Sequence, residues 1–289
     1  MSGSGELGGA GGAARPGERA PSARAGFEDK VALITGGSRG IGRAVALSLA
    51  ARGATPIINY RRNDEAARAT AGELERLGAS TLAIRADLER VEEIEQMFGQ
   101  VRERFGRLDF FVSNASASAF RPIMELRPHH LERTFNVNVR AFVIGAQRAA
   151  ELMHDGGRIV ALSSYGSQRT FPTYANLGAA KAAIESWARY MAVELASRGI
   201  NVNAVNGGII DSDSSAYFYS TGRVPPLETV VPKIPKQRLG TVQEVADCVL
   251  FLLAPASEYV TGSTLVVDGG LSALAPPFPS DMATSCAGA

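Results

Sequence analysis

The chain has 289 residues, an apolar content of 45% and a formal net charge of +1. This near-neutral balance does not indicate a nucleic-acid or membrane-surface partner, and no apolar run is long enough to span a bilayer. Cys248 and Cys286 do not predict a disulfide framework, and His129, His130 and His154 form no metal-binding motif, so neither a disulfide nor a metal site is expected.

Both ends of the chain are expected to lie outside the folded domain. Residues 1–26 are rich in Gly, Ala, Arg, Ser and Pro, and they almost lack the large apolar side chains whose burial offsets the entropy of ordering. They contain no apolar segment of the kind found in secretory signals, while Glu6 and Glu18 argue against a transit peptide. The sequence therefore predicts a cytoplasmic protein with a disordered tail over 1–26, a single domain over 27–275 and a C-terminal tail over 276–289.

From Lys30 onward, short apolar runs alternate with longer amphipathic stretches. Helical patterns cover, for example, Ile41–Arg52, Asp64–Leu77 and Val91–Phe105. Repeated βα units of this kind predict an α/β fold, a doubly wound parallel sheet of seven strands with helices on both faces (Rossmann-type). The expected strands are Val31–Thr35, Thr55–Tyr60, Thr81–Arg85, Leu108–Ser113, Arg158–Ser163, Asn201–Asn206 and Ser263–Val267. The proline-containing segment 212–237 is expected to be irregular, as active-site lids often are.

A glycine-rich turn follows the first expected strand. Thr35–Gly42 reads Thr-Gly-Gly-Ser-Arg-Gly-Ile-Gly and leads directly into a helical pattern. Glycines allow a tight turn and close approach of the backbone to a pyrophosphate, and the start of the helix supplies free N–H groups for that anion. In this strand–turn–helix context the motif predicts a dinucleotide site rather than an ordinary glycine loop.

The end of the second strand indicates which dinucleotide binds. NAD sites usually place Asp or Glu there to hold the ribose 2′-hydroxyl. This chain has Tyr60 at that point, followed by Arg61, and Arg39 lies within the glycine turn. Because arginine binds a 2′-phosphate in a bidentate manner, the cofactor predicted is NADPH; the alternative is that these arginines are only solvated surface charges.

Further motifs appear in the order typical of the short-chain dehydrogenase/reductase family, which residues 29–272 resemble. They are Thr35–Gly42, Asp87-Leu88, Ser113–Ala115, Asn138, Ser163-Ser164, the Tyr174/Lys181 pair, Gly207-Gly208 and Val267–Gly270. The resemblance implies that Asp87 holds the adenine, Asn114 the nicotinamide ribose, Asn138 a proton-relay water and Ile210 the nicotinamide amide. The full set of expected cofactor residues is Gly36, Ser38, Arg39, Gly40, Ile41, Gly42, Tyr60, Arg61, Asp87, Leu88, Asn114, Lys181, Gly208 and Ile210.

The catalytic tyrosine is displaced from its usual position. Ordinary family members carry Tyr-x-x-x-Lys, but here Leu177 stands four residues before Lys181, and Tyr174 stands seven before it. Three residues correspond to about 4.5 Å along a helix, and seven residues are two turns, so Tyr174 and Lys181 are expected to share a helix face. Together with Ser164 and Asn138 they form the expected catalytic set, in which Lys181 is expected to lower the pKa of the tyrosine.

The displacement suits the reduction of a carbon–carbon double bond beside a thioester. Hydride then attacks the β-carbon, and negative charge develops two bonds away on the thioester oxygen, so the group that stabilises this oxyanion must lie further from the hydride donor. The Tyr-x6-Lys spacing is that of enoyl-thioester reductases in the family. The alternative is an incidental tyrosine in a degenerate site. Tyr165 is a second phenol and is expected to contact the substrate or, alternatively, to pack at the end of a strand.

Other segments narrow the resemblance to type III bacterial enoyl-[acyl-carrier-protein] reductases and to reductases of cyclic enoyl-CoA thioesters. They are Phe111–Ala115, Pro128–Leu131, Ala161–Gly166, Pro172–Tyr174 and Val202–Gly208. The resemblance implies a homotetramer that reduces a cyclic enoyl-CoA such as 1-cyclohexenylcarbonyl-CoA, in the biosynthesis of a cyclohexanecarboxyl-CoA starter unit for an antibiotic. The alternatives are an enoyl-[acyl-carrier-protein] reductase of fatty-acid or polyketide synthesis, a ketoacyl thioester reductase, and a non-catalytic NADPH-binding regulator.

Overall fold

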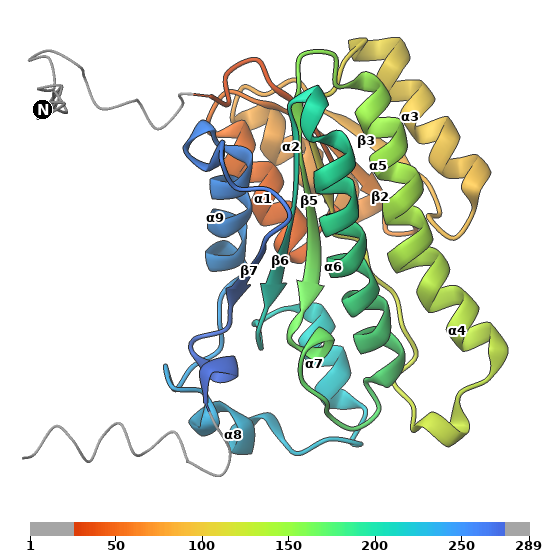
Figure 1. Ribbon diagram of the computed structural model, residues 1–289, viewed down its shortest axis with the longest axis vertical. Helices are drawn as coiled ribbons and strands as arrows, with labels where there is room; N and C mark the ends of the chain where they lie inside the picture. Colours follow the sequence, from red (N-terminus) through yellow and green to blue (C-terminus); the bar gives the residue numbers. More distant parts are fainter. Residues whose placement is uncertain (1–25, 275–289) are drawn as a thin grey trace, which may run out of the picture.

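The computed structural model describes residues 26–274. The tails expected at 1–26 and 276–289 lie outside these residues, apart from Gly26, and the single domain expected over 27–275 stays a prediction. In Figure 1 the strands run through the centre of the molecule, and helices lie on either side of them.

Seven strands form one parallel sheet in the order β3-β2-β1-β4-β5-β6-β7. The strands are β1 Val31–Ile34, β2 Thr55–Tyr60, β3 Leu82–Arg85, β4 Phe110–Ser113, β5 Gly157–Ser164, β6 Ile200–Gly207 and β7 Thr264–Val267. Each expected strand is present, with ends that differ by no more than two residues. The central strands β1, β4, β5 and β6 are buried over most of their length because helices cover both faces of the sheet.

Nine α-helices connect the strands of the described part of the chain. They are α1 Gly40–Ala50, α2 Asp64–Arg76, α3 Val91–Phe105, α4 Pro128–Phe135, α5 Ala141–Leu152, α6 Ala175–Leu195, α7 Asp213–Ser220, α8 Leu227–Val230 and α9 Val242–Leu253. The expectation of an irregular segment over 212–237 was wrong, because that segment contains α7 and α8. The signal that was missed is Ser212, whose Oγ accepts a hydrogen bond from Ser215 N and caps α7.

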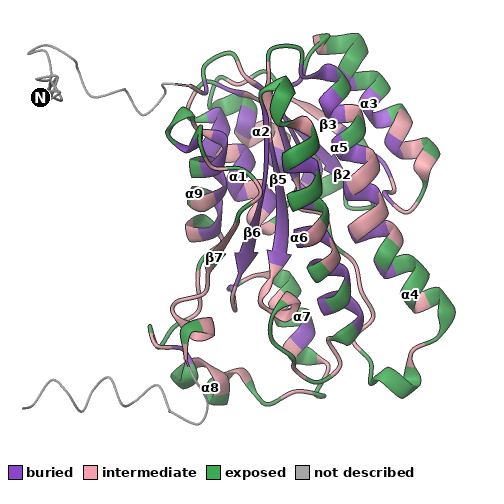
Figure 2. Ribbon diagram, viewed as in Figure 1, coloured by how far each residue is buried: buried purple, intermediate pink, exposed green. Residues whose placement is uncertain are grey.

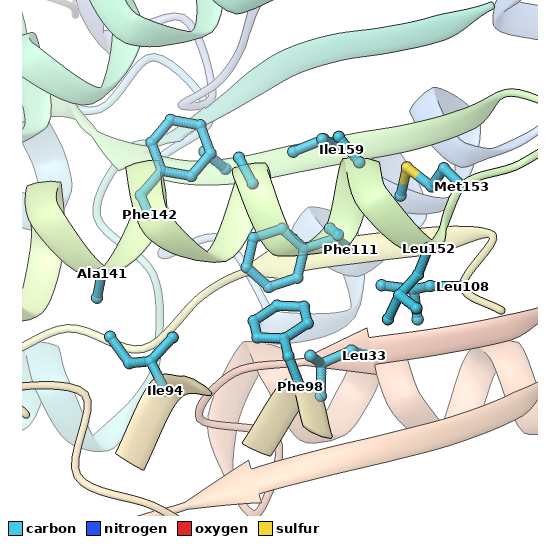
Figure 3. Packing of buried hydrophobic residues seen from close by; sticks show 14 of the residues in the cluster. Leu33, Ile94, Phe98, Leu108, Phe111, Ala141, Phe142, Leu152, Met153 and Ile159 are labelled. Carbon is cyan, nitrogen blue, oxygen red and sulfur yellow. The ribbon is translucent and has the colours of Figure 1, made fainter. Parts of the chain in front are cut away.

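The core has two halves, one on each face of the sheet. Leu33 of β1 packs with residues of α3, α5 and α6, whereas its neighbours Ala32 and Ile34 pack with α1 and α9 on the other face. Figure 2 shows the buried residues concentrated along the strands and on the inward sides of these helices. In Figure 3 the ring of Phe98 from α3 meets that of Phe111 from β4, edge to face, with centroids 5.7 Å apart. Removing either ring is expected to cost about 3–5 kcal/mol.

The order of the strands places the functional end of the sheet. The strands β1 to β3 are added toward one edge of the sheet, and the strands β4 to β7 are added toward the other edge. This reversal in strand order falls between β1 and β4, which lie side by side and parallel with Ile34 opposite Val112. In open α/β sheets, ligands bind in the crevice outside the carboxyl ends of the strands at such a reversal. The glycine turn, Asn114 and Ser164 all follow or end strands at this edge.

Candidate active site

A cavity of about 1160 Å³ opens at the carboxyl ends of the strands. Its wall extends from the glycine turn after β1 to α6 and α7. In Figure 1 the arrowheads of β5 and β6 point toward the lower part of the view, where α7 and α8 lie. The expected site residues that line it are Gly36, Ser38, Arg39, Gly40, Ile41, Tyr60, Arg61, Asp87, Leu88, Asn114, Ser164, Tyr165, Tyr174, Lys181 and Gly208.

The glycine turn has the backbone shape that a pyrophosphate requires. Gly36 and Gly40 have φ angles of +64° and +54°, which side chains with a Cβ rarely adopt. A Cβ on Gly42, which lies behind the cavity wall, would come within 2.5 Å of the Asn114 amide and of the Gly36 carbonyl. Arg39 precedes α1 without a side-chain cap, and the first turn of α1 contains no acidic residue. The free N–H groups there therefore fit an anionic ligand.

Asn114 joins the glycine turn to the end of β4. Its Nδ2 donates to the carbonyl oxygens of Thr35 and Gly36 at 2.9 and 3.1 Å, and its backbone N–H donates to Thr35 Oγ1 at 2.9 Å. Both amide hydrogens are used within the protein, so Oδ1 is the side-chain atom left to accept a hydrogen bond from a ligand.

Three arginines line the end of the cavity beside β2. Arg61 Nε donates to Asp87 Oδ2 at 2.7 Å, and Arg39 Nη1 lies 3.5 Å from Asp213 Oδ2. Both pairs are partly exposed and therefore contribute little to stability, so a phosphate can compete for these guanidinium groups. Arg62 was not singled out from the sequence; among the residues described it forms no ion pair.

The expected catalytic side chains come together at the end of β5. The Tyr174 hydroxyl donates to Ser164 Oγ at 3.2 Å, and Lys181 Nζ donates to the carbonyl oxygen of Leu162 at 2.6 Å. Leu177, at the ordinary tyrosine position, is only 6% exposed and lines the same cavity. Leu177 is aliphatic and cannot donate a proton. The candidate donors in this group are therefore the hydroxyls of Tyr174 and Ser164 and the ammonium group of Lys181.

Tyr174 stands at the start of α6 rather than within it. It is the N-cap residue, with φ −96° and ψ −5°, and its carbonyl accepts the hydrogen bond of Gly178 N at 2.8 Å. Because Tyr174 begins the helical hydrogen-bond ladder, the seven-residue spacing still brings its side chain and that of Lys181 to one cavity.

Burial determines the protonation of both groups. Burial raises the pKa of Tyr174, and the hydrogen bond to Ser164 only partly opposes this. Burial lowers the pKa of Lys181 to about 8, against the opposing effect of the Glu185 charge. The pKa of Tyr174 is therefore raised and not lowered, because desolvation of the phenolate dominates, and the expected lowering by Lys181 stays a prediction. At neutral pH Tyr174 holds its proton and Lys181 is mostly charged.

Aromatic rings from three separate segments surround Tyr174. The centroids of Phe120, Phe171 and Phe218 lie 5.5, 4.3 and 5.3 Å from that of Tyr174. Tyr165 stacks on Phe171 with centroids 6.2 Å apart and planes 14° from parallel, so it is part of the same wall. The sequence interpretation missed the three phenylalanines, because no local pattern links a loop, a turn and α7.

Asn138 lies behind the cavity wall. It is 1% exposed, and its Nδ2 donates to the carbonyl oxygens of Ala117 and Thr134, both at 2.8 Å. Its Oδ1 accepts a hydrogen bond from Ser116 Oγ at 2.7 Å. Both donors are thus used within the protein, and Asn138 lies in a π-type turn over Asn136–Arg140, outside the cavity lining. The proton-relay water expected at Asn138 stays a prediction.

Ile210 likewise lies outside the lining of the large cavity. It is 5% exposed and does not line the large cavity, whereas its neighbour Ile209 does. Ile210 pairs with Gly240 in an isolated β-bridge, and this extended backbone turns successive side chains to opposite sides. The nicotinamide contact expected of Ile210 stays a prediction.

The structure contains neither a metal-ligand cluster nor a membrane-spanning segment within residues 26–274. No group of three or more His, Cys, Asp and Glu side chains there is arranged to hold a metal ion. No helix among the same residues is both long and apolar enough to cross a membrane.

Comparison with known proteins decides the family. Residues 36–272 match the family described as enoyl-(acyl carrier protein) reductase, a span that includes Gly36–Gly42 of the glycine turn and the expected catalytic residues. The chain belongs to the short-chain dehydrogenase/reductase family. It is a reductase on a doubly wound seven-stranded sheet, as expected from the sequence, and its family uses nicotinamide cofactors.

Individual relatives cover most of the chain. The chain is 58% identical over 252 residues to 1-cyclohexenylcarbonyl-CoA reductase from Streptomyces collinus, covering 87% of this chain and 90% of that protein. A hydroxynaphthalene reductase-like protein from Metarhizium acridum is 36% identical over 251 residues, or 83% of this chain and 94% of the relative. A short-chain dehydrogenase from Burkholderia cenocepacia, solved in complex with NADP, superposes with a TM-score of 0.79 at 34% identity, covering 86% of this chain and 99% of that one.

Proposed function

We propose that this reductase uses NADPH to reduce the double bond of an α,β-unsaturated acyl-CoA thioester. The leading substrate is a cyclic enoyl-CoA such as 1-cyclohexenylcarbonyl-CoA, as the 58% identity to the Streptomyces collinus enzyme supports. The observation that carries the proposal is the placement of Tyr174. Its hydroxyl donates a hydrogen bond to Ser164 in the cavity, while Leu177 occupies the ordinary tyrosine position.

The site chemistry matches conjugate reduction. When bound, NADPH would supply the hydride for the β-carbon, and the α-carbon would then take its proton from solvent. Negative charge meanwhile develops on the thioester oxygen, where the protonated phenol of Tyr174 donates a hydrogen bond. Lys181, mostly cationic at neutral pH, lines the same cavity as the phenol and would hold the cofactor ribose.

The choice of NADPH rests on charge at the end of β2. Tyr60 lines the cavity where an NAD site would place a carboxylate, and Arg39, Arg61 and Arg62 lie around it. The glycine turn fits the pyrophosphate. Asn114 and Lys181 are assigned to the ribose on the nicotinamide side.

The acyl group is assigned to the aromatic wall. Phe120, Phe171 and Phe218 enclose Tyr174 and present apolar ring faces to the cavity, which suits a compact ring carried on a thioester. Tyr165 completes this wall and is assigned to the substrate.

Two cations on the substrate side favour CoA as the carrier. Arg169, which lies close to Tyr165, and Lys233 both line the cavity, and neither forms an ion pair with a carboxylate in the described chain. CoA carries phosphate groups that such cations bind, whereas a pantetheine thioester has no phosphate. Replacing both with Ala is therefore expected to raise the KM for an enoyl-CoA and to leave that for the pantetheine thioester nearly unchanged.

The homotetramer expected from the sequence also remains a proposal, as does the cytoplasmic location. Ala188 and Met191 of α6 face the core, yet Trp187, Tyr190 and Val193 of the same helix are 43, 67 and 80% exposed. A helix that is apolar on a second face is expected to pair with another subunit.

The test of the proposed function is an NADPH-oxidation assay with matched substrates. The panel contains 1-cyclohexenylcarbonyl-CoA, crotonyl-CoA, acetoacetyl-CoA and crotonyl-acyl-carrier protein. The expected order of kcat/KM places the cyclic enoyl-CoA first and the ketoacyl-CoA last. Preferred turnover of acetoacetyl-CoA establishes a ketoreductase instead, and preference for the protein-bound substrate establishes the acyl-carrier-protein alternative.

A further inference from the structure

A buried carboxylate lies behind the site, and the proposed chemistry does not use it. Glu185 of α6 is only 7% exposed. Its Oε1 accepts hydrogen bonds from Ser163 Oγ and Ser167 Oγ, both at 2.6 Å, and from Asn206 Nδ2 at 2.9 Å. Burying a charge is costly unless hydrogen bonds compensate for lost hydration, and three donors from three other elements do so here.

These donors flank the turn that carries the site. Ser163 directly precedes Ser164 at the end of β5, and Ser167 ends the single turn Tyr165–Ser167. Asn206 Nδ2 also donates to Ser167 Oγ at 2.9 Å, which closes the network from β6. Glu185 therefore holds the Ser164–Tyr165 segment from both sides.

The same carboxylate acts on Lys181. The two residues are four apart in α6, which places their Cβ atoms about 5–6 Å apart on one face of the helix. The partner of Lys181 in β5 is the neutral backbone carbonyl of Leu162, which accepts a hydrogen bond from Nζ. Of the groups in the described chain, only Glu185 opposes the effect of burial on the pKa of Lys181.

Other titratable groups share the cavity with Lys181, but none of them contributes to the shift in its pKa. The phenols of Tyr165, Tyr174 and Tyr219 line the same cavity, and burial raises the pKa of each, so they carry no charge near neutral pH. The cation Arg169, which follows the Tyr165 turn, points to the carbonyl of Ser272. Glu185 is thus the negative charge that bears on Lys181.

We propose that Glu185 is a positioning residue of this reductase: its carboxylate fixes the Ser164–Tyr165 turn through Ser163 and Ser167, and its charge keeps Lys181 cationic. Glu185 reaches neither substrate nor cofactor and acts through the residues that do. The inference rests on the proposed function for the roles of Tyr174 and Lys181.

The experiment separates the charge from the hydrogen bonds. Glu185→Gln keeps the shape and an oxygen acceptor but removes the charge, whereas the control Ser167→Ala removes one hydrogen bond and keeps the charge. NADPH affinity, from fluorescence titration, and kcat/KM with an enoyl-CoA are measured from pH 6 to 10. Loss of the charge lowers the pKa of Lys181, so Glu185→Gln is expected to move the alkaline midpoint of both profiles to lower pH by roughly one unit or more. Ser167→Ala is expected to leave both midpoints in place.

Two further variants keep the test decisive. Glu185→Met is a second neutral side chain of similar length, for use if Glu185→Gln does not fold, and it is expected to shift the midpoints in the same direction. Glu185→Asp restores the charge and is expected to restore the wild-type midpoints. A folded neutral variant with an unmoved midpoint, or an Asp variant that shifts as the neutral ones do, overturns the proposal. The NADPH titration needs no acyl substrate, so the test of Glu185 stands even if the wild-type protein fails to reduce enoyl-CoA.

Discussion

Replacing Tyr174 with Phe tests the assignment on which the proposed function depends. The substitution removes only the hydroxyl, which donates to Ser164 Oγ at 3.2 Å. The ring contacts with Phe120, Phe171 and Phe218 remain, so the aromatic wall and the start of α6 are expected to keep their structure. Any loss of activity then reports on the hydroxyl itself.

The expected size of that loss follows from the role of the phenol. Its raised pKa keeps Tyr174 protonated at neutral pH, so it is a ready hydrogen-bond donor to a thioester oxyanion. Removal of one such donor typically lowers kcat by about 10²–10³-fold, or roughly 3–4 kcal/mol. NADPH affinity is expected to be nearly unchanged, because the hydroxyl is assigned to the substrate.

Stopped-flow NADPH oxidation with 1-cyclohexenylcarbonyl-CoA measures kcat, and fluorescence titration measures cofactor binding. A matched variant, Tyr174→Phe/Leu177→Tyr, moves the phenol one turn, about 4.5 Å, to the ordinary position. It is expected not to recover enoyl reduction. Near-normal turnover by Tyr174→Phe alone would refute the reasoning, and Tyr165 would become the candidate donor.

The remaining predictions concern the cofactor, the lysine and assembly. Arg61→Ala is expected to raise the KM for NADPH more than that for NADH; equal use of both cofactors by the wild-type enzyme contradicts the assignment. Activity is expected to fall as the pH rises through about 8, the pKa of Lys181, because the charged form is then lost; a rate that stays level to pH 10 argues against this. Lys181→Ala is expected to lower both kcat and NADPH affinity, measured by steady-state kinetics and titration. Sedimentation at micromolar concentration is expected to show a tetramer, which Tyr190→Glu weakens, and a wild-type monomer rules out the assembly.

Much of the fold follows from the sequence because its signals are local. Four to eight apolar residues between amphipathic stretches indicate a strand buried on both faces, and the seven expected strands are those observed. The turn Thr35–Gly42 is equally local, since the positive φ angles of Gly36 and Gly40 belong to the motif itself. The irregular segment was mispredicted because its prolines outweighed the cap at Ser212.

Part of the site was also encoded locally. The seven-residue spacing of Tyr174 and Lys181 is a sequence fact, and the regular geometry of the start of α6 converts it into a shared cavity. The spacing did not give the protonation of these groups. Burial raises the pKa of Tyr174 and lowers that of Lys181, and burial is a property of all the elements that pack around a side chain.

The tertiary structure alone decided which distant residues meet. Phe120, Phe171 and Phe218 form one wall, although about fifty residues separate each from the next, and no helical or strand period relates them. Glu185 reads in sequence as one polar position of a helix, yet β5 and β6 bring Ser163 and Asn206 to its carboxylate. Periodicity and turn chemistry act over a few neighbouring residues, whereas burial, charge pairing and convergence on a cavity depend on chain crossovers that only the packed sheet and helices define.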